Sequence, residues 1–169
     1  FNTQDMETQL NWKKGFFKST CEIHSREKMI GKLKENIWSN TATGELNGNL
    51  ISFRPKGFTK QKTLIIDTVK NELLGEIDFN AFMTKATIRM GDKVFKWKYD
   101  NWLNTKWSIH DSEETLVHYS GSSLKGKISA STGDNLLTLT GLYLINYYWQ
   151  TVAVVLVAAL LPIYLAILQ

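Results

Sequence analysis

The sequence predicts a mainly β protein: a closed antiparallel β-barrel of about 10–12 strands, with a hydrophobic C-terminal helix through or beside it that extends into a membrane. Up to Ala130 the chain consists of short segments rich in β-branched and aromatic residues, separated by Gly, Asn and Asp. All 20 Lys and Arg and all 16 Asp and Glu residues lie between Asp5 and Asp134. A sheet of many strands leaves unpaired backbone groups at its two edges. A helix without a polar face must be covered on all sides by protein or lipid. Closing the sheet around the helix would satisfy both needs.

Length and composition indicate one domain. The chain has 169 residues, of which 43% are apolar, so it can bury a core. Its two prolines argue against a proline-rich linker. The net charge of +4 is too small to indicate a nucleic-acid partner. A single cysteine, Cys21, excludes an internal disulfide and a cysteine-cage zinc site.

Ten segments have the length and composition of strands, and several form hairpins. They are residues 16–23, 29–34, 49–54, 62–68, 72–78, 85–90, 93–99, 106–110, 114–120 and 126–129. Weaker candidates are residues 9–13 and 37–39. Lys70-Asn71 and Gly91-Asp92 are the turns of two hairpins. We therefore expect an N-terminal tail over residues 1–8 and a barrel over residues 9–134.

The uncharged end of the chain predicts one long helix. Thr132 or Asp134 can cap it. Residues 135–150 are expected to plug the barrel and residues 151–169 to form a membrane segment, because 151–168 would span about 27 Å as a helix. Tyr147, Tyr148 and Trp149 precede the most apolar run, where they would either mark the membrane interface or fill the mouth of the barrel. A β domain with a separate membrane tail is the plainer alternative.

The hairpin with the Gly91-Asp92 turn carries a basic outer face. Side chains alternate along a strand, and strict alternation places Lys85 opposite Lys98. The predicted lipid-binding residues on this face are Lys85, Arg89, Lys96 and Lys98. Each basic residue near an anionic membrane contributes about 1 kcal/mol. The alternative is a solvated basic face that discourages aggregation.

No constellation in the sequence predicts catalysis, a metal site or a cofactor. The histidines, His24, His110 and His118, have no metal-binding spacing. A hairpin turning at Ser112-Glu113 would place His110 opposite Thr115 and His118 opposite Trp107. Cys21 is expected to be a buried structural thiol. We therefore expect a protein that is not an enzyme.

The order of the elements resembles the tubby C-terminal-like superfamily, which includes tubby proteins, phospholipid scramblases and the LURP-one-related proteins. The resemblance covers roughly residues 9–150. It rests on the meander, on Ile65-Ile66-Asp67 leading through a turn to Leu74-Gly75-Glu76-Ile77, and on the terminal helix. It implies a twelve-stranded barrel closed around a hydrophobic C-terminal helix. The chain lacks the cysteine cluster and proline-rich arm of scramblases, and no binding residue of the family can be carried over.

The predicted function is a non-enzymatic, membrane-associated module that binds anionic lipid or a membrane-protein partner. One alternative is an accessory subunit of a larger membrane complex, and another is a scramblase-like protein. The expected location is a membrane, with the β domain on one face. The side is not determined, because no charge follows the hydrophobic segment.

Overall fold

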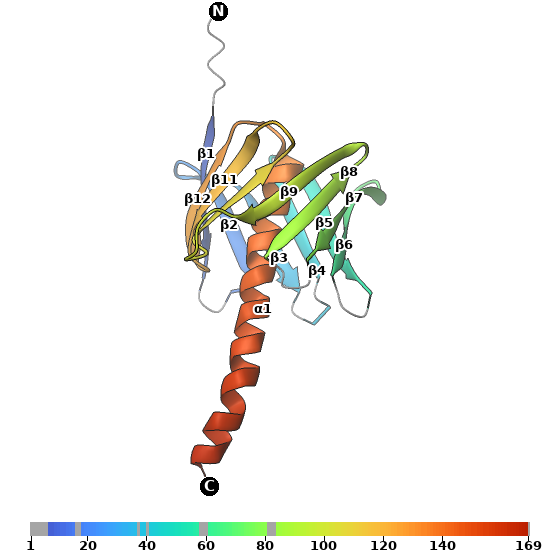
Figure 1. Ribbon diagram of the computed structural model, residues 1–169. Helices are drawn as coiled ribbons and strands as arrows, with labels where there is room; N and C mark the ends of the chain where they lie inside the picture. The colour runs from blue at the N-terminus through green and yellow to red at the C-terminus, as the bar shows by residue number, and fades with distance from the viewer. Residues whose placement is uncertain are drawn as a thin grey trace, which may run out of the picture.

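The computed structural model describes residues 7–15, 18–36, 38–39, 41–57, 61–80 and 84–168, and it contains twelve strands and one helix in these residues (Figure 1). The strands are β1 (Thr8–Lys14), β2 (Thr20–Ser25), β3 (Lys28–Asn36), β4 (Thr41–Leu46), β5 (Asn49–Lys56), β6 (Lys62–Asp67), β7 (Glu72–Phe79), β8 (Lys85–Met90), β9 (Lys93–Tyr99), β10 (Lys106–His110), β11 (Thr115–Gly121) and β12 (Lys125–Ala130). The helix is α1 (Asn135–Ile167).

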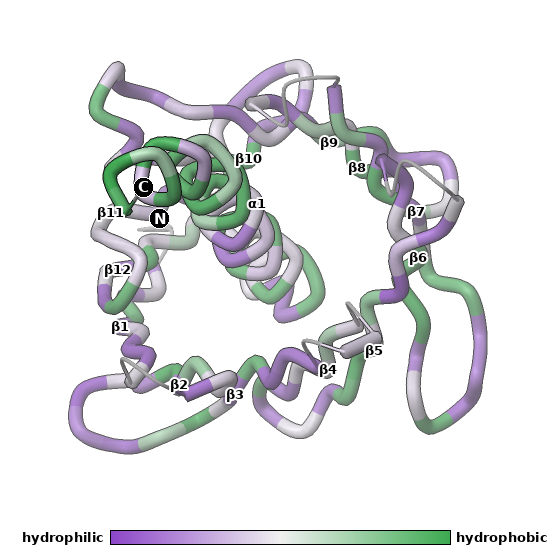
Figure 2. Tube along the Cα trace, turned by 90° about the horizontal axis from the view of Figure 1, so that it is seen from below, coloured by the Kyte–Doolittle hydropathy of each residue, from purple (hydrophilic) through white to green (hydrophobic). Residues whose placement is uncertain are grey.

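The strands form a closed antiparallel barrel. Each strand pairs with its neighbour in the chain, and β1 pairs with β12 from Thr8 opposite Ala130 to Lys13 opposite Lys125. Figure 2, which looks along the barrel from below, shows α1 inside the ring of strands. Closure leaves no unpaired edge that could recruit another chain. The predicted fold class, a mainly β closed barrel with a C-terminal apolar helix, is confirmed.

Alternating side chains build the core. Inward residues such as Phe53, Trp97 and Trp107 are fully buried, while their neighbours along each strand face outward, as the two-residue period of a strand requires. The first part of α1 fills the centre, because every residue from Leu137 to Asn146 is buried. Asp134 caps this helix by accepting a hydrogen bond from the backbone N–H of Leu137 at 3.0 Å.

Two close approaches explain glycines that have no obvious role in the sequence. A Cβ on Gly44 in β4 would lie 3.2 Å from Leu139 Cδ2, so the small residue lets the helix pack against this strand. Gly141 lies in the buried first part of α1, where the ring of Tyr119 occupies the space of its missing side chain. The Tyr119 hydroxyl donates a hydrogen bond to the Thr138 carbonyl at 2.9 Å.

The strand predictions were wrong in two places. Residues 41–46 form β4 although no strand was predicted there, because Ala42 and Gly44 give a weak β pattern and owe their state to packing. In the candidate strand 37–39, Trp38 and Ser39 instead form part of a turn, and their backbone N–H groups donate hydrogen bonds to Asn36 Oδ1. Ile37 lies outside the described residues, as do residues 16–17 of the predicted strand 16–23. That strand begins later than predicted, at Thr20.

The predicted register of the β10–β11 hairpin was also wrong. His110 faces Thr115 as expected, but a bulge follows and His118 faces Ser108 rather than Trp107. A bulge inserts one residue into one strand, so strict alternation from the turn fails beyond it. This shift places His110, His118 and Ser108 on the outer face of one wall of the barrel.

Candidate functional site

The second half of α1 is apolar and uncovered. All residues from 153 to 168 are exposed, whereas residues 137–146 of the same helix are buried. Within the described part of the chain, α1 is the helix long and apolar enough to cross a membrane. The predicted membrane segment, residues 151–168, extends about 27 Å as a helix, which is close to the roughly 30 Å thickness of the hydrocarbon core of a bilayer. This arrangement is compatible with membrane association.

Tyr147, Tyr148 and Trp149 lie in the mouth of the barrel, where α1 leaves it. The ring of Tyr147 stacks on that of Phe79, with 5.0 Å between centroids. The Tyr148 ring meets the Tyr99 ring edge-on at 4.9 Å, and its hydroxyl accepts a hydrogen bond from Asn104 Nδ2 at 3.1 Å. These aromatics therefore hold the helix in the mouth at the level where its exposed part begins. Their role at a membrane interface stays a prediction.

The predicted basic residues of β8 and β9 separate into two environments. Lys85 lies opposite Lys98, as strict alternation predicts. With Lys96, these two lysines line a depression of about 460 Å³ that also contains Asp78 and His110. Arg89 does not line this depression, and it forms an ion pair with Asp78 at its edge. Among the described residues, Lys85 and Lys98 have no ion pair, so they are better candidates for an external anion than Arg89.

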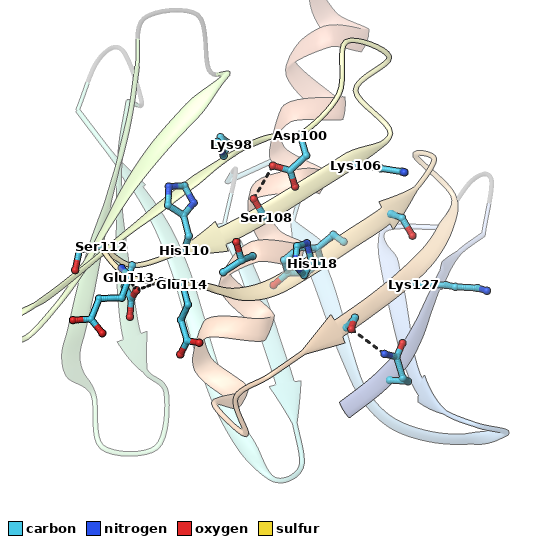
Figure 3. Close-up of a pocket in the computed structure, with 16 residues that line it drawn as sticks. Lys98, Asp100, Lys106, Ser108, His110, Ser112, Glu113, Glu114, His118 and Lys127 are labelled. Atoms are coloured by element: carbon cyan, nitrogen blue, oxygen red, sulfur yellow. Dashed lines mark hydrogen bonds between the residues drawn. The ribbon is translucent and has the colours of Figure 1, made fainter. Parts of the chain in front are cut away.

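An open groove lies on the outer wall formed by the strands from β9 to β12 and by β1 (Figure 3). Its volume is about 710 Å³, and its lining includes Lys98, Asp100, Lys106, Ser108, His110, His118 and Lys127. Burial, together with the nearby charge of Lys98, lowers the pKa of His110. Sequence reasoning missed this groove because its residues come from several strands and the β10–β11 bulge sets their alignment.

The side chains in the outer groove are not arranged for nucleophilic catalysis. Ser108 Oγ donates its hydrogen bond to Asp100 at 2.8 Å (Figure 3), whereas a catalytic triad needs a histidine between the serine and the carboxylate. The described residues contain no group of three or more His, Cys, Asp or Glu side chains that could hold a metal ion. Burial raises the pKa of the Cys21 thiol to about 12, so that group is not an activated nucleophile.

Charge is sorted between the two ends of the barrel. We define the exit rim as the turns between β1 and β2, β3 and β4, β5 and β6, β7 and β8, β9 and β10, and β11 and β12, each with its flanking strand residues. The other turns and the segment before α1 form the far rim. Among described residues, the exit rim carries seven lysines and one aspartate: Lys14, Lys18, Lys56, Lys62, Lys85, Lys106, Lys125 and Asp100.

The far rim has the opposite balance, with eight carboxylates and four basic residues. They are Glu27, Asp67, Glu72, Asp92, Asp111, Glu113, Glu114 and Asp134, against Arg26, Lys28, Lys70 and Lys93. Asp111 accepts hydrogen bonds from the backbone N–H groups of Glu113 and Glu114, which lower the pKa of its carboxyl group. The barrel is thus basic where α1 leaves it and acidic where α1 begins.

Comparison with known proteins identifies the fold alone. No family model matches the chain, and no curated protein matches it. The X-ray structure of an Arabidopsis thaliana protein, AT5G01750, is similar, with a TM-score of 0.57 and 13% sequence identity. The similarity covers 82% of this chain and 89% of that one. The closed barrel with its C-terminal helix is compatible with the tubby-like and LURP-one-related fold that the sequence resembles.

Proposed function

We propose that the chain is a membrane-anchored barrel of the tubby-like type, which binds anionic lipid or a membrane-protein partner and catalyses no reaction. The observation that carries this proposal is the exposure of residues 153–168, which contain no charged side chain. Burying a Val, Leu or Ile side chain is worth about 1.5–3 kcal/mol relative to leaving it in water. Many such side chains on one uncovered helix favour a lipid environment.

An accessory subunit of a membrane complex is the second candidate. In that case residues 153–168 would be covered partly by helices of a partner protein and partly by lipid. Copurification from membranes at fixed stoichiometry would favour this role. A chain that is stable and monomeric in detergent, and that retains lipid, would favour the lipid-binding role. The missing scramblase features make lipid transport the weakest of the three proposals.

The anchor is tested by an alkaline carbonate wash of membranes that contain the full chain. We expect the unchanged chain to stay in the membrane pellet and the double variant Val157→Lys with Leu160→Lys to be released. The reason is that each lysine near the centre of a spanning helix opposes insertion by about 2.5–3.5 kcal/mol. Val157→Ala with Leu160→Ala is the matched control, because it trims the same positions without adding charge, and it should stay in the pellet.

Both substituted positions lie outside the barrel and are exposed, so neither pair should alter the thermal unfolding of the β domain. An unchanged chain that is soluble and monodisperse without detergent would contradict the proposed anchor. So would a lysine variant that resists carbonate as well as the alanine control.

A further inference from the structure

We propose that the exit rim is a docking surface for an anionic membrane leaflet, so that the barrel rests end-on against lipid headgroups. This inference rests on the proposed membrane anchor. Helix α1 begins at the far rim, passes through the barrel and leaves at the exit rim (Figure 1). Where residues 151–168 cross a bilayer, the exit rim is therefore the part of the barrel nearest the headgroups.

The exit rim exposes two tryptophans. Trp38 in the β3–β4 turn is 98% exposed and Trp102 in the β9–β10 turn is 87% exposed, whereas Trp12, Trp97 and Trp107 are buried. Indole rings concentrate at membrane–water interfaces, where the apolar ring and the polar N–H are both accommodated. The turns of the far rim contain no Trp, Tyr or Phe. The exposed aromatic side chains of the turns are thus confined to the end that would meet the lipid.

Side-chain hydrogen bonds restrain the described backbone of both turns. Asn36 accepts from the backbone of Trp38 at 3.1 Å. In the other turn, Asn101 Oδ1 accepts from the backbone N–H groups of Thr105 and Lys106, each at 3.0 Å. These hydrogen bonds restrain the described backbone beside Trp38 and Trp102, so less conformational freedom is lost when the two indoles enter the interface.

The charges of the two rims favour the same orientation. Lys14 and Lys62 are paired with carboxylates, but the other five lysines of the exit rim have no ion pair among the described residues. Each unpaired lysine near an anionic surface strengthens binding about fivefold. The acidic far rim lies about 20 Å away along the strands, beyond the roughly 8 Å screening length at physiological salt. Only the reverse orientation would bring the acidic far rim into repulsive contact with the anionic leaflet.

Single-cysteine labelling of the full chain in vesicles tests this docking. Cys21 is buried and should not react, which labelling of the unchanged chain checks. Ser39→Cys and Ser123→Cys place a polarity-sensitive dye on the exit rim, and Ser112→Cys places it on the far rim. In vesicles with 30% phosphatidylserine, we expect quenching by aqueous acrylamide to fall roughly twofold or more for the exit-rim dyes relative to pure phosphatidylcholine. The dye at residue 112 should show no such change.

A charge variant and its control sharpen the test. Replacing Lys56, Lys85, Lys106 and Lys125 by Gln should abolish the effect of phosphatidylserine, whereas replacing Lys28, Lys70 and Lys93 on the far rim should preserve it. Exit-rim dyes that stay equally quenched on both lipids, in a chain that resists carbonate, would overturn the docking surface and leave the anchor intact. A chain that carbonate removes from the vesicles would overturn the proposed anchor itself.

Discussion

Replacing Leu139 or Leu142 by Asp is expected to unfold the barrel. Both side chains have an exposed fraction of 0% and lie at the centre of the core, on the buried half of α1. Each substitution removes a buried leucine, at a cost of about 2–5 kcal/mol, and introduces a carboxyl group without a partner, which costs several kcal/mol more. The sum is comparable with the total stability of a typical domain, about 5–15 kcal/mol.

The measurement is thermal or urea unfolding of the detergent-solubilised chain, followed by circular dichroism and tryptophan emission. Leu156→Asp is the matched control, because it makes the same chemical change on the same helix where the side chain is 55% exposed. It should leave the unfolding of the barrel unchanged. A Leu139→Asp protein that unfolds at the temperature of the unchanged chain would show that α1 is not the core of the barrel.

Gly141→Ala is expected to destabilise the protein, although the same change in most helices is stabilising. Alanine is favoured over glycine by about 0.8–1.0 kcal/mol in a helix interior. Here the added methyl group would overlap the phenol ring of Tyr119 and lie 2.6 Å from its Cε2 atom. Both groups are buried and cannot move apart freely, so overpacking of about 1–3 kcal/mol should outweigh the helical preference. The free energy of urea unfolding, compared with that of the unchanged chain, shows whether Gly141→Ala stabilises or destabilises the protein.

Two further variants identify Tyr119 as the cause. Gly133→Ala is the control, because a Cβ at Gly133 meets no atom within 4 Å. Combining Gly141→Ala with Tyr119→Leu should cost less than the sum of the two single changes, since shortening the side chain removes the overlap. A stabilising Gly141→Ala, or additive costs, would contradict this account.

Turn residues and side-chain alternation predicted the features of the fold that depend on neighbouring residues in the chain. The Gly91-Asp92 turn and two-residue alternation gave the full register of β8 against β9, including Lys85 opposite Lys98. They failed at β4, whose weak strand pattern is overridden by the packing of Gly44 against Leu139. They failed again at His118, because nothing in the sequence marks the bulge in the β10–β11 hairpin.

The candidate functional surfaces could not be predicted from local patterns, because closure of the barrel brings their residues together. Lys85 and Lys98 could be placed together from one hairpin, but Asp78, which pairs with Arg89, comes from the preceding strand. The outer groove and the exit rim join segments far apart in the chain. Grouping Trp38 with Trp102 requires knowing that alternate turns of a closed meander share one end, which no single hairpin reveals.

The order of elements along the chain constrains how the molecule folds. Helix α1 follows all twelve strands, yet it supplies the centre of the core on which they close. The wall itself closes only when β1 meets β12, where Gln9 and Ser129 are paired across 120 residues. Bringing such distant segments together costs entropy before burial compensates for it. Neither half of the chain contains a complete core. We therefore expect slow, cooperative folding in which the barrel strands and the helix inside them become ordered together.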